Sequence, residues 1–381
     1  MLDVLIVGGG PAGAALALAL ADSGLEFRVL DARAEGQLGA RDRTLALSHS
    51  ARLVFERIGV WHALGSVTPI ATIDVSQRGR FGVTELRARD LALPALGYVI
   101  RYGELQGALD AALPAAGMAI DFATRVERIV AHDDCVAITA RTNDVERALE
   151  ARLVVVADGS GEALPELHRR RIDYRQHALV GVVGAASPRR GVAFERFTAD
   201  GPVALLPYES RYALVWTLTP ERAAQMLAAD DATFLDALHA HFGDRVGRFT
   251  GISGRSSFPL TLQFASRVVG TRAVVLGNAA QALHPIAGQG FNLGLRDVAT
   301  LAEQLLDTPR AEIGSEHQLA RYEKSRRVDR WAGVVMTHGL VRGFASDHPL
   351  LALPRGLGLT LLDSVPPLKR AFARAMLNGL H

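Results

Sequence analysis

The chain has 381 residues, of which 49% are hydrophobic and 22% charged, and its formal net charge is +2. This composition predicts a globular protein long enough for two domains and excludes a disordered chain. The single cysteine, Cys135, excludes an internal disulfide framework and a cysteine zinc site, and we predict no metal site.

Charge and hydropathy patterns also limit the partners and the compartment. Nearly all of the positive charge is arginine, and no basic block is interleaved with aromatic residues, so we expect no nucleic-acid partner. No uninterrupted apolar run reaches the roughly 18 residues of a membrane-spanning helix. Residues 2–21 are apolar, but Asp3 leads them and glycines interrupt them, which argues against a signal peptide. We therefore expect a cytoplasmic protein.

The chain begins with a strand, a glycine-rich turn and a helix. Residues 4–7 form a buried strand run, an alanine-rich helix continues to about Ser23, and a second strand over residues 27–30 ends at Asp31. The turn between them has the pattern Gly-x-Gly-x-x-Gly and consists of Gly8, Gly9, Gly10, Pro11, Ala12 and Gly13. In this pattern the first glycine permits the tight turn, the second leaves space for a pyrophosphate, and the third lets the helix pack on the strand. Asp31 can accept a hydrogen bond from a ribose hydroxyl, so the unit predicts a bound dinucleotide.

The next segments add a basic candidate and a second strand end. We favour Arg43 over Arg41 as a pyrophosphate ligand, because an arginine just beyond the ribose-binding strand can reach it; a solvated arginine is the alternative. Helices are predicted over residues 50–58 and 103–113, and strands over residues 72–76 and 126–139. A fully buried strand over residues 153–156 leads to an Asp158-Gly159 turn, at the kind of strand end where ligands collect in open α/β sheets.

From residue 179 to residue 218 the pattern changes to short strands separated by turns, which is typical of an antiparallel sheet. The predicted strands are residues 179–183, 192–197, 203–207 and 212–216, and a helix over residues 233–242 follows. We expect this inserted sheet to carry the substrate surface. The last fifth of the chain is predicted to be helical over residues 319–345, 349–362 and 367–380.

Residues 274–294 read as a strand, a loop and the start of a helix. The strand ends at Gly277, the loop carries Pro285, Gly288 and Gly290, and the helical pattern continues to about Leu305. Glycines at such a junction let the backbone approach a planar or anionic ligand, and the free N–H groups of the first helical turn supply positive potential. A tight turn into a packed helix is the alternative.

In this order, the glycine-rich turn, Asp158-Gly159, and Gly277-Asn278 before the run from His284 to Gly290 resemble the FAD-dependent aromatic hydroxylases, the class A flavoprotein monooxygenases. Residues 277–294 are similar to the ubiquinone-pathway branch of that family. Residues 194–198, 201–202 and 206–207 resemble bacterial hydroxylases of 2-polyprenyl-6-methoxyphenols. The likeness covers residues 5 to about 330, with Asp31 in place of the usual glutamate and Asn278 in place of the usual aspartate.

The resemblance implies an α/β fold with a Rossmann-like FAD-binding domain of the GR2, or para-hydroxybenzoate hydroxylase, type. It also implies an inserted antiparallel-sheet substrate domain and C-terminal helices. We predict that residues 1–75, 98–178 and 265–330 form the FAD-binding domain. Residues 76–97 and 179–264 would form the substrate domain, and residues 331–381 the C-terminal helical region.

The resemblance further implies an oxidoreductase that uses NADPH or NADH, bound FAD and O2. A flavin C4a-hydroperoxide would transfer one oxygen atom to a polyprenylated methoxyphenol, para to its hydroxyl, in ubiquinone biosynthesis. The residues implied to bind FAD are Gly8, Gly10, Pro11, Ala12, Gly13, Asp31, Arg43, Asp158, Gly277, Asn278, Pro285, Gly288, Gly290, Phe291 and Asn292. The residues implied to serve catalysis are His284, Pro285, Gly288, Gln289 and Gly290. Backbone N–H groups from Gly288 to Asn292 would stabilise negative charge on reduced flavin, and His284 is a candidate base, with a structural or flavin-adjacent role as the alternative.

Three other functions fit the same motifs. These are a sibling hydroxylase acting at another ring carbon, a mainly structural FAD-containing subunit of a quinone-biosynthesis assembly, and a flavin reductase of prenyl double bonds. The last predicted helix has Leu368 and Phe372 on one face and Lys369, Arg370 and Arg374 on the other. We expect this helix to pack on its own protein; peripheral contact with the inner membrane or with a protein complex is the alternative.

Overall fold

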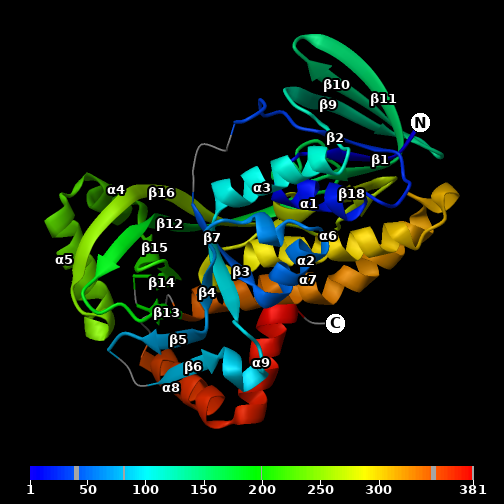
Figure 1. The fold of residues 1–381 in the computed structure, drawn as a ribbon. Coiled ribbons are helices and arrows are strands. Elements are labelled where there is room, and N and C mark those ends of the chain that lie inside the picture. Colours follow the sequence, from blue (N-terminus) through cyan, green and yellow to red (C-terminus); the bar gives the residue numbers. More distant parts are fainter. Residues whose placement is uncertain (38–42, 80–81, 199, 345–348, 380–381) are drawn as a thin grey trace.

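The computed structural model describes residues 1–37, 43–79, 82–198, 200–344 and 349–379. In this part of the chain, two eight-stranded sheets and one three-stranded sheet are joined and covered by helices (Figure 1). None of the helices in these ranges combines the length and the apolar composition needed to cross a membrane.

The first sheet has the strand order β17–β18–β11–β1–β2–β8, and β9 and β10 extend it beside β11. Its parallel strands are β1 (Leu2–Val7), β2 (Phe27–Leu30), β8 (Ile120–Asp121), β11 (Val145–Val156) and β18 (Ala273–Val275). Its antiparallel strands are β9 (Thr124–Ala131), β10 (Val136–Thr142) and β17 (Val269–Gly270). The predicted runs 4–7 and 153–156 are fully buried here, because helices cover a parallel sheet on its faces.

Three helices accompany this sheet: α1 (Pro11–Ala19), α3 (Tyr102–Ala115) and α6 (Gln289–Leu306). Helix α1 ends four residues before the predicted Ser23. The carboxyl ends of β1, β2, β11 and β18 meet at one edge, which is the edge where ligands bind in open α/β sheets.

The second sheet has the order β19–β16–β12–β15–β14–β13–β5–β6. Its strands are β5 (Thr72–Gln77), β6 (Val83–Arg87), β12 (Arg169–Ala185), β13 (Val192–Phe197), β14 (Val203–Tyr208), β15 (Arg211–Leu218), β16 (Phe249–Ala265) and β19 (Gln281–Ala282). Helices α4 (Pro220–Ala228) and α5 (Asp231–Phe242) cover one face around Phe194, Trp216 and Phe242. The predicted antiparallel order holds throughout except between β13 and β5, which pair in parallel.

A small three-stranded sheet packs beside the second sheet at β14 and contacts helices α3 and α6. This sheet consists of β3 (Thr44–Ser48), β7 (Gly97–Arg101) and β4 (Thr68–Ile70), in that order. Helix α2 (His49–Arg57) follows β3 directly in the chain. Strand β3 was not predicted, because only its last two residues are buried. Ser48 ends the strand and caps α2 by accepting a hydrogen bond from the Ala51 N–H at 3.1 Å.

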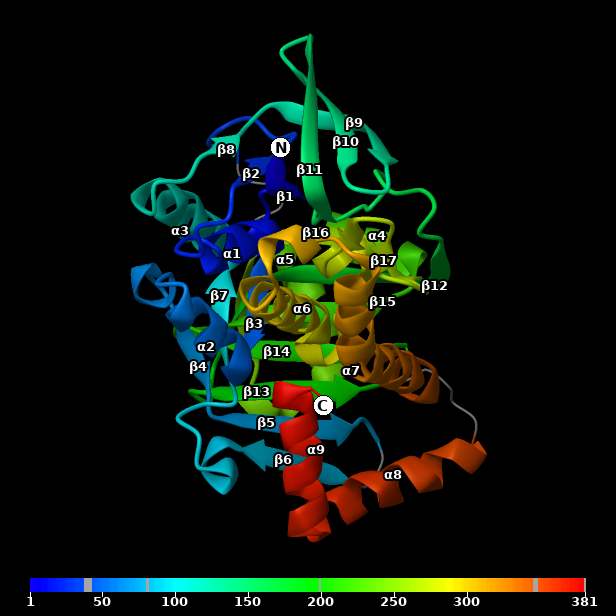
Figure 2. The same cartoon turned by 90° about the vertical axis from the view of Figure 1, so that its right-hand side faces the viewer.

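Three helices end the chain: α7 (Glu316–Phe344), α8 (Pro349–Ser364) and α9 (Pro366–Asn378). Figure 2 shows α8 and α9 beside the β5–β6 end of the second sheet. Helix α9 packs on its own protein there, since Ala373 and Leu377 are buried against Leu86 and Leu96. The predicted α/β architecture with a largely antiparallel second sheet and C-terminal helices is confirmed. The domain boundaries stay a prediction; β5 pairs within the second sheet.

Candidate functional site

The turn after β1 has a backbone that requires glycine. Gly8 has φ +104°, and a Cβ there would lie 2.7 Å from the backbone of Ala157 on β11. A Cβ on Gly13 would lie 1.9 Å from the Gly8 carbonyl oxygen, so the third glycine lets α1 approach the strand. At Gly10 a Cβ would meet no atom within 4 Å, because this position opens into a cavity. The packing around Gly8, Gly10 and Gly13 is therefore compatible with the separate role expected of each glycine.

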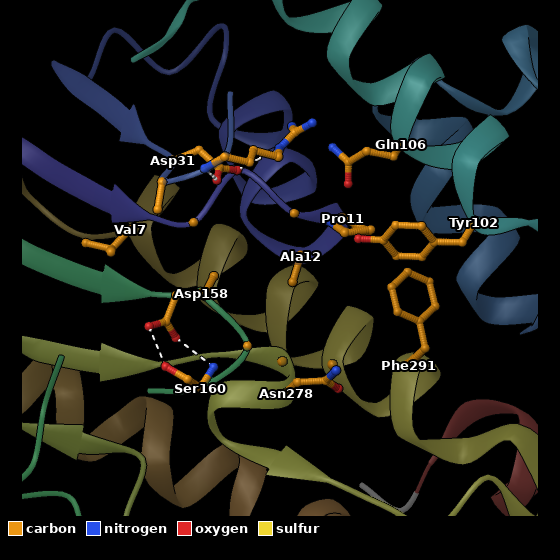
Figure 3. A pocket seen from close by; sticks show the side chains of 18 of the residues that line it. Val7, Pro11, Ala12, Asp31, Tyr102, Gln106, Asp158, Ser160, Asn278 and Phe291 are labelled. Atoms are coloured by element: carbon orange, nitrogen blue, oxygen red, sulfur yellow. Dashed lines mark hydrogen bonds and ion pairs between the residues drawn. The ribbon is translucent and has the colours of Figure 1, made fainter. Parts of the chain in front are cut away.

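A cavity of about 810 Å³ extends from this turn along the edge of the first sheet (Figure 3). Eleven of the predicted cofactor residues line it: Gly8, Gly10, Pro11, Ala12, Asp31, Arg43, Asp158, Gly277, Asn278, Gly290 and Phe291. Gly13 lies behind it in α1. Pro285 and Gly288 lie in the loop before α6 and Asn292 lies in that helix, and none of the three lines this cavity.

Asp31 is held by a polar network that spacing alone did not reveal. Its carboxylate accepts hydrogen bonds from the Gly9 N–H at 2.8 Å and from the Arg33 side chain at 2.9 Å. Arg33 also makes a two-pronged ion pair with Asp110, at 2.7 and 2.8 Å, and the pKa of its guanidinium is raised beside Asp110 and Asp31. The network fixes Asp31 at the rim of the cavity, where a ribose hydroxyl could donate to it.

Gln106 on α3 is a second residue that the sequence did not single out. Its side chain is 2% exposed, lines the cavity, and donates from Nε2 to the Gly9 carbonyl at 3.0 Å. Its Oε1 has no partner among the described residues, so it is available to accept a hydrogen bond from a ligand. Arg43 lies near the same helix, with its guanidinium carbon 5.9 Å from the centre of the Tyr102 ring. Arg41 lies outside the described residues.

The opposite wall is made by the turns after β11 and β18. The Asp158 carboxylate accepts hydrogen bonds from the Ser160 N–H at 3.0 Å and the Gly161 N–H at 2.6 Å, which shapes the Asp-Gly turn. Arg169 from β12 donates to the Ala279 carbonyl at 3.1 Å and to the Gly161 carbonyl, and so joins the two turns. Asn278 projects from the second turn, on the same side of the cavity as Asp158 (Figure 3).

The residues around this cavity fit a bound dinucleotide. The N-terminus of α1 has no acidic residue in its first turn, so its free N–H groups present positive potential where Gly10 leaves open space. The volume lies within the range of cofactor sites. Carboxylate and amide side chains lie toward the two ends of the cavity. A dinucleotide, which is anionic at its centre and polar at both ends, requires such groups there.

The residues predicted to form the site in the loop before α6 and at the start of that helix lie in different environments. Gly288 has φ +60° and caps α6, and Gly290 and Phe291 reach the large cavity. Asn292 is 4% exposed, and its amide bonds the Ala46 and Gly288 carbonyls and the Ser48 N–H. Its side chain thus ties α6 to β3.

His284 lies beneath the loop and is 1% exposed. Its Nδ1 accepts a hydrogen bond from the Ile286 N–H at 3.1 Å, and its ring meets Tyr174 edge to face. Burial lowers the pKa of His284 to about 4, so the imidazole is neutral at neutral pH. It lines neither cavity, and its place favours support of the loop over contact with a substrate.

A second, apolar cavity of about 170 Å³ lies on the other side of β3 and the α6 N-terminus. Aliphatic and aromatic side chains from β5, β6, β13 and α9 dominate its walls, together with Ile286 and Gln289 from the loop region. Dry cavities of about 150 Å³ take a benzene-sized ring. The neighbours Leu45 and Ala46 on β3 line different cavities, so one strand separates the polar site from the apolar one.

Known proteins resemble this chain in sequence and in fold. A family model described as "FAD binding domain" matches residues 1–337. The chain belongs to the FAD-binding domain family. The ubiquinone hydroxylase UbiL of Rhodospirillum rubrum is 36% identical to this chain, with 99% of the chain and 90% of the relative covered. The 3-demethoxyubiquinol 3-hydroxylase of Escherichia coli is 30% identical, with 97% and 96% covered.

Among solved structures, the p-nitrophenol 4-monooxygenase PnpA of Pseudomonas putida has a TM-score of 0.78 to this chain at 17% identity, over 100% of this chain and 99% of that one. At this identity the likeness speaks for the fold. The family match and the hydroxylase relatives together confirm the predicted class of enzyme, a flavin-dependent aromatic hydroxylase. For a member of the FAD-binding domain family, the large cavity is the candidate FAD site.

Proposed function

We propose that this protein hydroxylates the ring of a polyprenylated methoxyphenol in ubiquinone biosynthesis, para to its hydroxyl. NADPH or NADH and O2 would be consumed, one oxygen atom would enter the ring, and the other would leave as water. The FAD would occupy the 810 Å³ cavity and the phenol ring the 170 Å³ cavity.

The observation that carries the proposal is the pair of cavities with one shared wall. A polar cavity with a dinucleotide-binding turn and an apolar cavity large enough for a benzene ring lie on the two sides of β3 and the start of α6. An aromatic hydroxylase needs its cofactor site and its substrate site to be adjacent, because the ring must lie next to the oxygen-transferring cofactor and away from water. The names of the two relatives support a ubiquinone-pathway phenol.

The chain itself supplies binding, orientation and dryness. When bound, FAD supplies electron transfer and oxygen activation. The glycine-rich turn and the α1 N-terminus would hold its pyrophosphate, and Asp31 its ribose. Backbone N–H groups at the start of α6 would stabilise negative charge near the ring system. The apolar walls would exclude water from the site of oxygen transfer.

The identity of the ring carbon that is hydroxylated is the most specific part of the proposal. A hydroxylase acting at another carbon is a second candidate, because one relative is named for a 3-hydroxylation. Both would use the same two cavities, and the product alone separates them.

The test is reduction of the purified yellow protein by NADPH or NADH without oxygen, followed by air, with and without a short-chain 2-prenyl-6-methoxyphenol. We expect the mass of the phenol to rise by one oxygen atom and the product to be the 1,4-quinol. Oxygen at another ring carbon would support the sibling hydroxylase. Fast peroxide release without product, or no reduction, would overturn the proposal and favour a structural FAD-containing subunit. A gain of hydrogen alone would indicate a prenyl reductase.

We also propose that the protein works at the cytoplasmic surface of the inner membrane, alone or within a quinone-biosynthesis complex. Leu357 and Leu361 on α8 and Leu368 on α9 are exposed apolar side chains, and these helices help to wall the apolar cavity. Co-sedimentation with anionic vesicles tests this. The double variant Leu361→Lys and Leu368→Lys should lose binding; equal binding of variant and wild type would argue against contact through these helices.

A further inference from the structure

Glu195 is a carboxylic acid on the cavity side of the second sheet. It lies on β13, where side chains alternate between the two faces. Phe194 belongs to the core under α5, so Glu195 points to the opposite face. There it shares the floor of the apolar cavity with Phe197 on the same strand and with Val75, its register partner on β5.

This carboxyl is the only ionisable side chain among the described residues that line the apolar cavity. Burial is the only cause acting on its pKa, which means that no described residue offers it a hydrogen bond or an opposite charge. A partly buried carboxyl that has no partner among the described residues costs stability, and such groups persist where a function needs them.

Charged groups on the surrounding elements face elsewhere. On β5 and β6, Asp74 and Glu85 share the opposite face, where Asp74 pairs with Arg245. On α9 the residues that line the cavity are Phe372, Ala373, Met376 and Leu377, and Lys369 pairs with Asp363 outside it. Gln289 and Asn292 are the amides that approach from α6. Among the described residues that line this cavity, Glu195 is therefore the one acid or base that can take a proton from a phenol.

We propose that Glu195 is a catalytic residue that binds the phenolic hydroxyl of the substrate and receives its proton. The proposal rests on the proposed function and names the group that activates the ring. An apolar cavity orients a prenylated ring only loosely, and a single polar group at its floor fixes where the hydroxyl lies.

The step balances without another reactant beyond those of the proposed reaction. As the ring carbon attacks the oxygen delivered from reduced flavin and O2, the phenolic O–H bond breaks and its proton passes to the Glu195 carboxylate. The ring is then a dienone. When that carbon loses its hydrogen as a proton, aromaticity returns, and the carbonyl oxygen recovers a proton from Glu195. Glu195 ends as it began. NAD(P)H supplies two of the four electrons that O2 takes up, the ring supplies the other two, and the second oxygen atom leaves as water.

Burial raises the pKa of Glu195 to about 8. This value approaches that of a phenol, about 10, so a proton can move between the two groups in both directions. The base is active when deprotonated, so the rate of product formation should rise as the pH increases toward about 8.

The test compares wild type with Glu195→Gln, Glu195→Asp and the control Glu85→Gln, which removes the same charge from the opposite face of the sheet. Glutamine keeps the shape and can still accept a hydrogen bond, but it cannot take a proton. We expect FAD content and KM of Glu195→Gln to stay near wild type, kcat for oxygenated product to fall about 100-fold, and the rise with pH to disappear. NAD(P)H oxidation should continue, with hydrogen peroxide as its product. Glu195→Asp should retain the rise with pH at a lower rate, and Glu85→Gln should match wild type.

Unfolding temperature gives a readout that is independent of turnover. The folded pKa of about 8 lies above the ordinary glutamate value of 4.5, so the folded state holds more protons between these values. The contribution of Glu195 to wild-type stability should therefore fall as the pH rises from about 4.5 to about 8. Glu195→Gln should lack this fall.

The outcomes separate the two claims. Wild type that adds no oxygen to the phenol overturns the proposed function and the role of Glu195 with it. Wild type that forms product, together with Glu195→Gln of equal kcat and equal pH profile, overturns the role of Glu195 alone.

Discussion

The side chain of Asn292 joins the start of α6 to β3, and Asn292→Ala would cut this connection. Its Nδ2 donates to the Ala46 carbonyl at 3.0 Å and to the Gly288 carbonyl at 2.7 Å, and its Oδ1 accepts from the Ser48 N–H at 2.8 Å. Alanine removes all three bonds and leaves two carbonyls and one N–H without these partners.

The expected loss follows from those three groups. A buried polar group that loses its partner costs about 1–3 kcal/mol, and the low end for each gives roughly 3 kcal/mol of unfolding free energy. At about 2 °C per kcal/mol the unfolding temperature should fall by roughly 6 °C. Because Leu45 and Phe291 line the cofactor cavity on the two joined elements, FAD binding should weaken as well. If about half of the lost free energy holds that wall in place, Kd for FAD rises roughly tenfold.

The assay is thermal unfolding followed by circular dichroism, with FAD affinity measured by flavin fluorescence. Gln304→Ala on the same helix is the control, since its side chain makes one hydrogen bond of 3.3 Å to Ser325. The control should unfold within about 1 °C of wild type. An Asn292→Ala protein with wild-type unfolding temperature and wild-type FAD affinity would refute the reasoning that this amide holds the wall.

Three further substitutions test the surroundings of the site. Gly10→Val should fold like wild type but purify without FAD, because its side chain enters the cavity where a Cβ meets no atom; a normal flavin spectrum would contradict this. Gly13→Ala should lose both stability and FAD, since its Cβ would lie 1.9 Å from the Gly8 oxygen; wild-type unfolding would count against it. The pKa of His284 is lowered to about 4, so only the unfolded chain protonates this residue between pH 6.5 and 4, and His284 should contribute a stability loss of up to about 3 kcal/mol as the pH falls through that window. His284→Phe should lose less across the same window in unfolding experiments, and an identical acid slope would contradict this.

Local sequence patterns located the elements whose residues are buried in succession. The runs 4–7 and 153–156 were found because a parallel sheet buries both faces of its strands. Only part of the long strand β12 was predicted, and β16 was missed, because their ends carry polar and charged residues such as Arg169 and Arg170. Pairing with a neighbouring strand, which no local pattern records, extends them.

The two cavities differ in how far the sequence could reveal them. Gly8 and Gly13 were recognisable because one tight turn requires a positive φ at the first and a close approach of backbone at the second, within six residues. The walls of the apolar cavity come from residues 46–48, 70–97, 195–197, 286–292, 340 and 362–377, so no spacing within a motif connects them. Glu195 was identified only as part of a resemblance, because its place as the single acid among the described residues that line the apolar cavity depends on tertiary structure.

Strand β3 has Leu45 on the polar cavity and Ala46 on the apolar one, so we expect binding in one cavity to affect binding in the other. A displacement of β3 changes the shape of both cavities, so the factor by which FAD alters the affinity for a phenol must equal the factor by which the phenol alters the affinity for FAD. A phenol added during purification would then slow the loss of flavin on dilution, although it contacts none of the glycines that hold the cofactor.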